Sequence, residues 1–214
     1  MIKEYIAKQR TLFTASFYLL SFLLLTLVIV KFSFFKAIDE TLAVRDRPFY
    51  STERYFSLMI FDNYGLRWVS FIVLASFSLL AYKRVRKSFL LFTPLIALLV
   101  VNLSVAGVKF FVDRSKPTSG RSTFFTENYH SYPSGHMVNI IVMYLLSFYI
   151  IKKFTLFKAK RVLPYRYLNV AMTIGFIATS VERNTHWLSD LLAGVLLGLA
   201  IYYFVKAWLE NLTK

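Results

Sequence analysis

Long apolar runs alternate along this chain with short polar segments, and the runs approach the length of a bilayer-spanning helix. About 20 apolar residues are needed to cross a membrane as an α-helix. Six such runs, of which the second and the fifth are short, predict helices at 12–34, 67–82, 89–108, 136–151, 167–181 and 187–208. We therefore expect an all-α polytopic membrane protein, a six-helix transmembrane bundle that forms one domain over residues 1–214.

The two longest polar segments lie between predicted spans. Within the first, residues 48–61 indicate an extracytoplasmic amphipathic helix at the membrane interface, with Ser51 or Thr52 as its cap. The second segment, 118–132, mixes polar residues with phenylalanine and tyrosine and is expected to act as a lid. We interpret His130 in this segment as a solvated loop residue rather than a catalytic one.

Composition and charge agree with a membrane protein and orient it. Only 17% of the residues are charged, against about 25% in soluble proteins. If the N-terminus is cytoplasmic, the inner segments hold 15 of the 26 Lys and Arg residues and few acidic ones; these segments are 1–11, 82–88, 152–166 and the tail after 205. An excess of Lys and Arg in short loops marks the cytoplasmic side. Both termini are therefore predicted to be cytoplasmic.

The same features exclude several classes of function. The net charge of +15 follows the predicted topology rather than one binding face, which argues against a nucleic-acid partner. The absence of cysteine excludes disulfides, thiol nucleophiles and thiolate metal ligands. The first apolar run is longer than a signal-peptide core and no small-residue cleavage site follows it, so we expect it to be a retained span.

Chemistry-bearing residues cluster at three span ends that this orientation places on the outer face. The segment 109–117 leaves the third span, 133–136 enters the fourth, and 186–190 opens the sixth. The three clusters are therefore expected to converge at one depth, outside the cytoplasm.

His186 and Asp190 are four residues apart, a spacing that places both side chains on one face of a helix. The carboxylate can accept the proton of one imidazole nitrogen and leave the other nitrogen free to attack phosphorus. The alternative is a capping arrangement, since Asp is common at helix starts.

The sequence Pro-Ser-Gly-His at 133–136 precedes a predicted helix. Gly135 allows backbone N–H groups to approach a ligand, and the helix N-terminus favours a phosphate. Ser134 is then a hydroxyl donor and His136 a general acid. The alternative is a serine turn that caps the helix.

Lys109, Arg114 and Lys116 form the cationic cluster. The transition state of phosphoryl transfer needs several cations around the phosphoryl oxygens. The alternative for an isolated lysine at a span end is contact with lipid headgroups.

Together the clusters resemble the three-part signature of the type 2 phosphatidic acid phosphatase superfamily, which is Lys-x6-Arg-Pro, Pro-Ser-Gly-His and Ser-Arg-x5-His-x3-Asp. The second element matches in full, and the first matches in spacing, with Lys116 in the position of the arginine. The third matches at His186 and Asp190, but Ser180 stands where the family has its arginine. Arg183 or Arg114 is the candidate to replace that guanidinium, and the alternative is a site with fewer hydrogen-bond donors. The resemblance covers about 105–200.

The resemblance implies roles for the matched residues. His186 attacks phosphorus to form a phosphohistidine, Asp190 orients His186, and His136 protonates the leaving alkoxide. The phosphoryl oxygens are held by Lys109, Lys116, Ser134 and the Gly135 amide. No cofactor or metal is implied, and the sequence has no carboxylate-rich or histidine-rich ligand set.

The implied function is that of an integral membrane lipid phosphatase at the periplasmic face of a bacterial inner membrane, with a membrane lipid phosphate and the bilayer as its partners. The candidate substrates are lipid A 1-phosphate, which is slightly preferred, phosphatidylglycerol phosphate, phosphatidic acid and undecaprenyl diphosphate. The enzymatic alternative is a phosphotransferase of the same superfamily. A non-enzymatic transporter or scaffold is the other alternative, but ionisable groups here lie at span ends rather than at mid-membrane.

Overall fold

The computed structural model describes residues 2–32, 34–42, 65–117, 130–154, 159–182 and 186–212, and every regular element in these ranges is a helix. Six helices are long and one is short. They are α1 (Ile2–Lys31), α2 (Phe34–Leu42), α4 (Gly65–Val85), α5 (Phe89–Phe111), α6 (Gly135–Phe154), α7 (Ala159–Glu182) and α8 (Leu188–Leu212).

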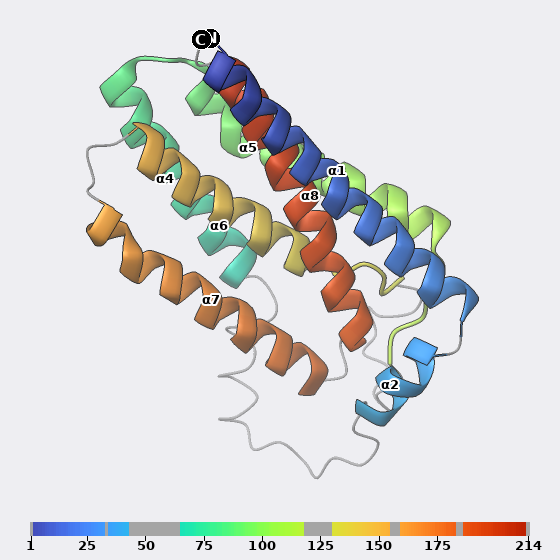
Figure 1. Cartoon of the computed structure of the whole chain (residues 1–214). Helices are drawn as coiled ribbons and strands as arrows, with labels where there is room; N and C mark the ends of the chain where they lie inside the picture. Colours follow the sequence, from blue (N-terminus) through green and yellow to red (C-terminus); the bar gives the residue numbers. More distant parts are fainter. Residues whose placement is uncertain are drawn as a thin grey trace, which may run out of the picture.

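The six long helices lie side by side and alternate in direction along the chain (Figure 1). Both termini therefore lie at one end of the bundle, next to the turn between α4 and α5. The chain leaves α5 and enters α6 and α8 at the opposite end, where α2 also lies. The expected all-α membrane architecture is confirmed, and each of the six predicted spans corresponds to a helix.

Helix α6 is the centre of the bundle. It contacts α4, α5, α7 and α8, and 67% of its most apolar window is buried. Helix α1 packs mainly on α8 and is the most exposed of the spans, with only 11% of its apolar window buried. An apolar helix with so little burial needs lipid rather than water around it.

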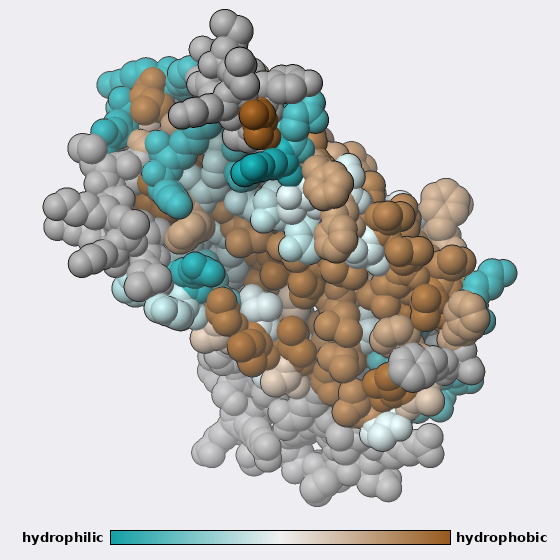
Figure 2. Space-filling view, viewed as in Figure 1, coloured by the Kyte–Doolittle hydropathy of each residue, from teal (hydrophilic) through white to brown (hydrophobic). Residues whose placement is uncertain are grey.

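The outer surface is apolar around the middle of the bundle. Phe13, Leu20, Phe92, Leu99 and Leu168 belong to the many large hydrophobic side chains that point outwards. Figure 2 shows this brown surface, with hydrophilic side chains gathered toward the end that carries the termini. Side chains that face the hydrocarbon of a bilayer have this character, and the chain is a multi-pass membrane protein.

Among the described residues, five helices are long and apolar enough to cross a membrane: α1, α4, α5, α6 and α8. The sixth predicted span, 167–181, lies within α7 but does not reach the same apolarity. Arg166, Asn169 and Thr173 dilute the apolar character of this helix. The count of six spans therefore stays a prediction, although α7 runs beside α6 and contacts it.

Two glycines let α8 approach α6 closely. A Cβ atom at Gly194 would lie 2.9 Å from Cβ of Met137 and 3.0 Å from the carbonyl oxygen of Ser134. A Cβ atom at Gly198 would lie 2.9 Å from Cβ of Ile141. Small residues four apart allow this approach between membrane helices. The contact at Gly194 also sets the distance between the two functional ends of α6 and α8.

The polar segment before α4 contains a helix that the sequence analysis did not predict, α2. The amphipathic helix predicted at 48–61 lies outside the described residues, as does most of the predicted lid, from 118 to 129.

Candidate active site

The structure brings the three predicted clusters together at the end of the bundle opposite the termini. Ser131 donates its backbone N–H to the carbonyl oxygen of Arg114 at 2.7 Å. Trp187 donates its indole N–H to the carbonyl oxygen of Ser115 at 2.8 Å. Ser134 donates its backbone N–H to the carbonyl oxygen of Asp190 at 3.1 Å. Hydrogen bonds thus join the segment after α5, the turn before α6 and the start of α8.

His186 lies just before α8, and Asp190 lies in the first turn of that helix. The Asp190 side chain is fully buried, and its Oδ2 atom is 3.6 Å from Nδ1 of His186. The same oxygen accepts the backbone N–H of Trp187 at 3.1 Å. Asp190 therefore caps α8, and the same carboxylate oxygen also faces the imidazole. Nδ1 of His186 is buried, with no hydrogen-bond partner within 3.5 Å among the described residues.

Arg114 lies between two buried carboxylates. Its Nη1 atom donates to Oδ1 of Asp190 at 2.6 Å and to Oγ of Ser189 at 2.7 Å. Its Nη2 atom donates to Oδ2 of Asp39 at 2.6 Å. The guanidinium also stands 5.6 Å from the ring centroid of Trp187. These partners already balance the positive charge of Arg114, which leaves little of it for a phosphoryl group.

Asp39 is the residue at this site that the sequence analysis missed. It lies on α2, is buried, and accepts hydrogen bonds from both the backbone N–H and the hydroxyl of Ser189. A signal was present in the sequence. Phe35, Ile38, Asp39 and Leu42 have the spacing of one helix face, so an acidic residue occupies a position on the apolar face.

Ser134 and Gly135 form the entry to α6. The carbonyl oxygen of Ser134 accepts the N–H of Val138 at 3.1 Å, so Ser134 is the residue at which the helix begins, but this bond uses the main chain and not the serine hydroxyl. Its hydroxyl is buried and has no partner among the described residues. A buried hydroxyl without a partner is suited to receive a ligand oxygen. The His136 ring is half-buried, with its centroid 6.0 Å from that of Phe176 on α7.

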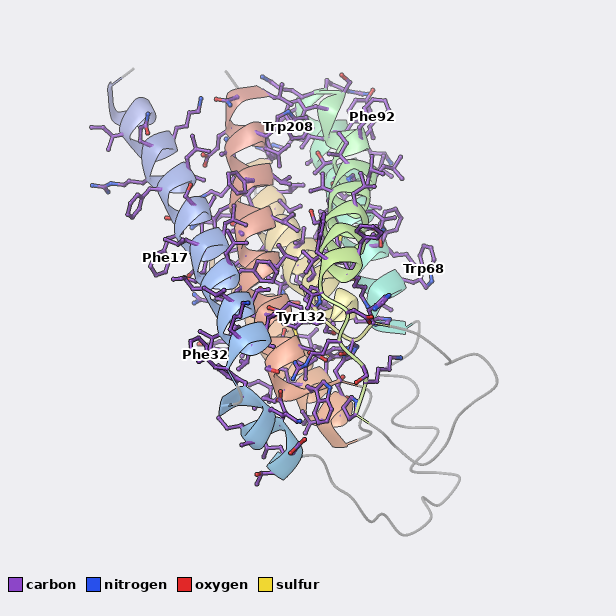
Figure 3. All side chains as sticks on the ribbon, turned by 90° about the vertical axis from the view of Figure 1, so that its right-hand side faces the viewer. Phe17, Phe32, Trp68, Phe92, Tyr132 and Trp208 are labelled. Atoms are coloured by element: carbon purple, nitrogen blue, oxygen red, sulfur yellow. The ribbon has the colours of Figure 1, made fainter. Side chains whose placement is uncertain are left out.

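Tyr132 fixes the position of this turn. It is fully buried, its ring stacks on Phe22 with centroids 6.2 Å apart, and its hydroxyl shares a 2.6 Å hydrogen bond with the Thr26 hydroxyl. Figure 3 shows Tyr132 inside the bundle, whereas Phe17, Trp68 and Phe92 lie on its outside. The turn before α6 is therefore anchored to α1 by an aromatic side chain.

Lys109 lies in the last turn of α5 and donates to the carbonyl oxygen of His130. Its ammonium group is close enough to Lys116 and Asp190 for their charges to interact. The His130 ring is half-exposed and lies 2.7 Å from a carboxylate oxygen of Asp113. His130 therefore has a charged partner that the sequence analysis did not foresee, although it remains a loop residue at the edge of the site.

Arg183, one of the two candidates to replace the family arginine, lies outside the described residues. Ser180 is buried on α7, one helical turn after Phe176. Within the described ranges, His, Asp and Glu side chains form no group of three that could hold a metal ion.

One comparison with known proteins shows the family of the chain, and another shows its fold. The family model of the PAP2 superfamily matches residues 90–214. A similar solved structure is the transmembrane PAP2-type phosphatidylglycerolphosphate phosphatase from Bacillus subtilis, with a TM-score of 0.73 and 19% sequence identity. The alignment covers 93% of this chain and 97% of that one, and at this identity it shows a common fold. No curated protein sequence matches the chain.

Proposed function

The chain belongs to the PAP2 superfamily, and from this membership we propose that it is an integral membrane phosphatase that hydrolyses the phosphate ester or pyrophosphate of a membrane lipid. The observation that carries the proposal is the contact between the two histidine-bearing elements. The turn that presents His136 donates a hydrogen bond, through Ser134, to the carbonyl oxygen of Asp190, the residue that faces His186.

In the proposed first step, Nε2 of His186 attacks phosphorus in line with the leaving alkoxide. Because Nδ1 faces the carboxylate of Asp190, that carboxylate stabilises the positive charge that develops on the imidazole. The P–O bond to the lipid breaks as the N–P bond forms, and His136 transfers its proton to the departing alkoxide. Water then attacks the phosphohistidine, gives a proton to His136, and releases phosphate as the N–P bond breaks.

The phosphoryl oxygens are proposed to lie near the unpartnered Ser134 hydroxyl at the N-terminus of α6. Lys109 and Lys116 supply positive charge there. In this assignment Arg114 orients Asp190 instead of binding phosphate, because two carboxylates already surround it. Arg183 remains the candidate for the guanidinium that Ser180 does not provide.

The proposed orientation places this site outside the cytoplasm, at the periplasmic face of a bacterial inner membrane. The end of the bundle with the two termini also carries the basic turn around Lys83, Arg84 and Lys87. Basic residues of this kind mark the cytoplasmic end. Helix α6 ends at the cytoplasmic end and α8 begins at the site, so the chain must cross the membrane between them. This proposal therefore requires α7 to be the sixth span.

The substrate class is tested by phosphate release from purified lipid phosphates in detergent. The panel contains lipid A 1-phosphate, phosphatidylglycerol phosphate, phosphatidic acid and undecaprenyl diphosphate. We expect release from at least one of them, and none from glycerol phosphate, which lacks a lipid tail. An added acceptor lipid distinguishes a phosphotransferase, which would form a phosphorylated acceptor in place of free phosphate.

A further inference from the structure

Helix α2 inserts one carboxylate, Asp39, into the contacts behind the proposed catalytic pair. The Asp39 side chain is only 1% exposed. We propose that Asp39 is a positioning residue that fixes the orientation of the Asp190 carboxylate by holding Arg114 and Ser189. This inference rests on the proposed function, because it concerns the geometry of the His186–Asp190 pair.

The hydrogen bonds around Asp39 form a closed ring in which each donor has its acceptor. Arg114 donates from Nη1 to the Ser189 hydroxyl, and that hydroxyl donates to Oδ2 of Asp39. Nη2 of Arg114 donates to the same carboxylate oxygen at 2.6 Å. The other oxygen, Oδ1, accepts the backbone N–H of Ser189 at 3.1 Å and so ties α2 to the first turn of α8.

This ring limits how Arg114 contacts Asp190. A guanidinium beside a carboxylate commonly donates two parallel hydrogen bonds, one to each oxygen. Here Asp39 takes Nη2, so Arg114 reaches Asp190 through Nη1 and Oδ1 alone. The second oxygen of Asp190, Oδ2, is left to face His186 and the Trp187 N–H. Because Asp39 accepts the hydrogen bond from Nη2, Arg114 does not bind Oδ2 of Asp190, and that oxygen stays available to His186.

The charges agree with this role. Two almost fully buried carboxylates share one guanidinium, so the three groups together carry one negative charge. Burial of these charged side chains costs free energy, and a protein with apolar residues of similar volume in their place is often more stable. The Asp190 carboxylate, which faces His186, favours the positive charge that the imidazole gains when it attacks phosphorus.

The test compares Asp39→Asn with Glu40→Gln. Asn keeps an oxygen that can accept the Ser189 N–H, but it removes the charge that competes for Arg114. Glu40 is the next residue on α2, its side chain is 44% exposed, and its contact with Lys36 is 3.9 Å long, so Glu40→Gln is the matched control. We expect Asp39→Asn to lower kcat by about 10-fold or more, as expected for hydrogen bonds to charged groups, with KM within about two-fold. Glu40→Gln keeps the wild-type values.

Two further measurements separate positioning from loss of fold. The amount of folded protein, measured as the single peak from size-exclusion chromatography in detergent, gives the number of active sites, so the turnover rate is expressed per active site. The ¹⁵N chemical shifts of labelled histidine report the tautomer of His186. The chain has only three histidines, and the loss of signals in His130→Ala and His136→Ala assigns the spectrum. We expect wild-type His186 to carry its proton on Nδ1, and Asp39→Asn to change this tautomer.

Each outcome decides the inference. A lower turnover rate per site together with a changed His186 tautomer supports it. Wild-type turnover and tautomer in Asp39→Asn overturn it, and so does a loss of activity explained entirely by fewer active sites. If the wild-type protein hydrolyses no lipid phosphate, the proposed function fails, whereas the tautomer comparison still decides whether Asp39 positions the pair.

Discussion

The backbone N–H of Ser134 donates a hydrogen bond to the carbonyl oxygen of Asp190, 3.1 Å away. The two residues are far apart in the sequence, yet this bond joins the turn before α6 to the first turn of α8. Because it uses only main-chain atoms, substitution of a side chain at the site removes neither its donor nor its acceptor. Variants of the catalytic side chains can therefore be tested without loss of this contact.

Replacement of each histidine by alanine tests whether that histidine is needed for turnover. We expect His186→Ala to lower turnover by about 10³-fold or more, the effect of removing a nucleophile. His136→Ala is expected to lower turnover by about 10²- to 10⁴-fold, the contribution of a general acid. Phosphate release in detergent measures both effects.

His130→Ala is the matched control for these two variants. Its side chain contacts exposed Asp113, and Lys109 binds only its carbonyl oxygen, which the substitution retains. We expect activity close to that of the wild type. Full activity in His186→Ala or His136→Ala would contradict the assigned roles.

Hydrolysis is expected to continue in excess EDTA. The proposed chemistry assigns the attack to an imidazole and the charge stabilisation to lysines and helix N–H groups, so no step needs a divalent metal. The measurement is the rate of phosphate release with and without the chelator. Loss of activity that added Mg²⁺ or Mn²⁺ restores would count against the histidine mechanism.

Gly194→Ala is expected to separate α6 from α8. The new Cβ atom would lie 2.9 Å from Cβ of Met137 and 3.0 Å from the Ser134 carbonyl oxygen, which is closer than van der Waals contact, so the helices must shift. Overpacking of this kind costs about 1–3 kcal/mol. We expect a lower midpoint of thermal unfolding in detergent together with lower activity, because Ser134 and Asp190 move apart.

Gly107→Ala provides the comparison, since a Cβ atom there has nothing within 4 Å. Alanine also has the higher helix propensity, so stability should stay the same or rise slightly. Equal unfolding midpoints for the two variants would show that the close approach at Gly194 has no energetic role.

The absence of cysteine in the chain allows a direct test of orientation. We expect Glu40→Cys, on α2, to react with a membrane-impermeant maleimide added to intact spheroplasts. Arg84→Cys, at the end of α4, should react only after the membrane is permeabilised. The reverse pattern would place the site on the cytoplasmic side.

The sequence predicted the long helices, because the apolar residues that define each of them lie within the helix itself. Apolar length alone located all six long helices, because a span must satisfy its backbone hydrogen bonds within itself. The convergence of 109–117, 133–136 and 186–190 followed from the alternation of the spans. The apolarity of α7 was overestimated, because Arg166 and its polar neighbours lie among the apolar residues of that helix.

Asp39 was missed because its importance depends on tertiary partners. Its position on the apolar face of α2 was a signal of burial, but an acidic residue in a long polar segment resembles many solvated side chains. The contacts with Arg114 and Ser189 explain its burial. Capping of the helix and orientation of His186 are alternatives for Asp190 in the sequence, but the two are compatible. A carboxylate has two oxygens, and in the structure one of them contacts both the helix N-terminus and the histidine.

The central claim is that His186 becomes covalently phosphorylated during turnover. Rapid quenching of the purified protein with a ³²P-labelled lipid phosphate that it hydrolyses tests this most directly. We predict an acid-labile, base-stable phosphoprotein that forms and decays at rates compatible with turnover, and that is absent from His186→Ala. Turnover without any labelled protein, or the same label retained in His186→Ala, would contradict the claim.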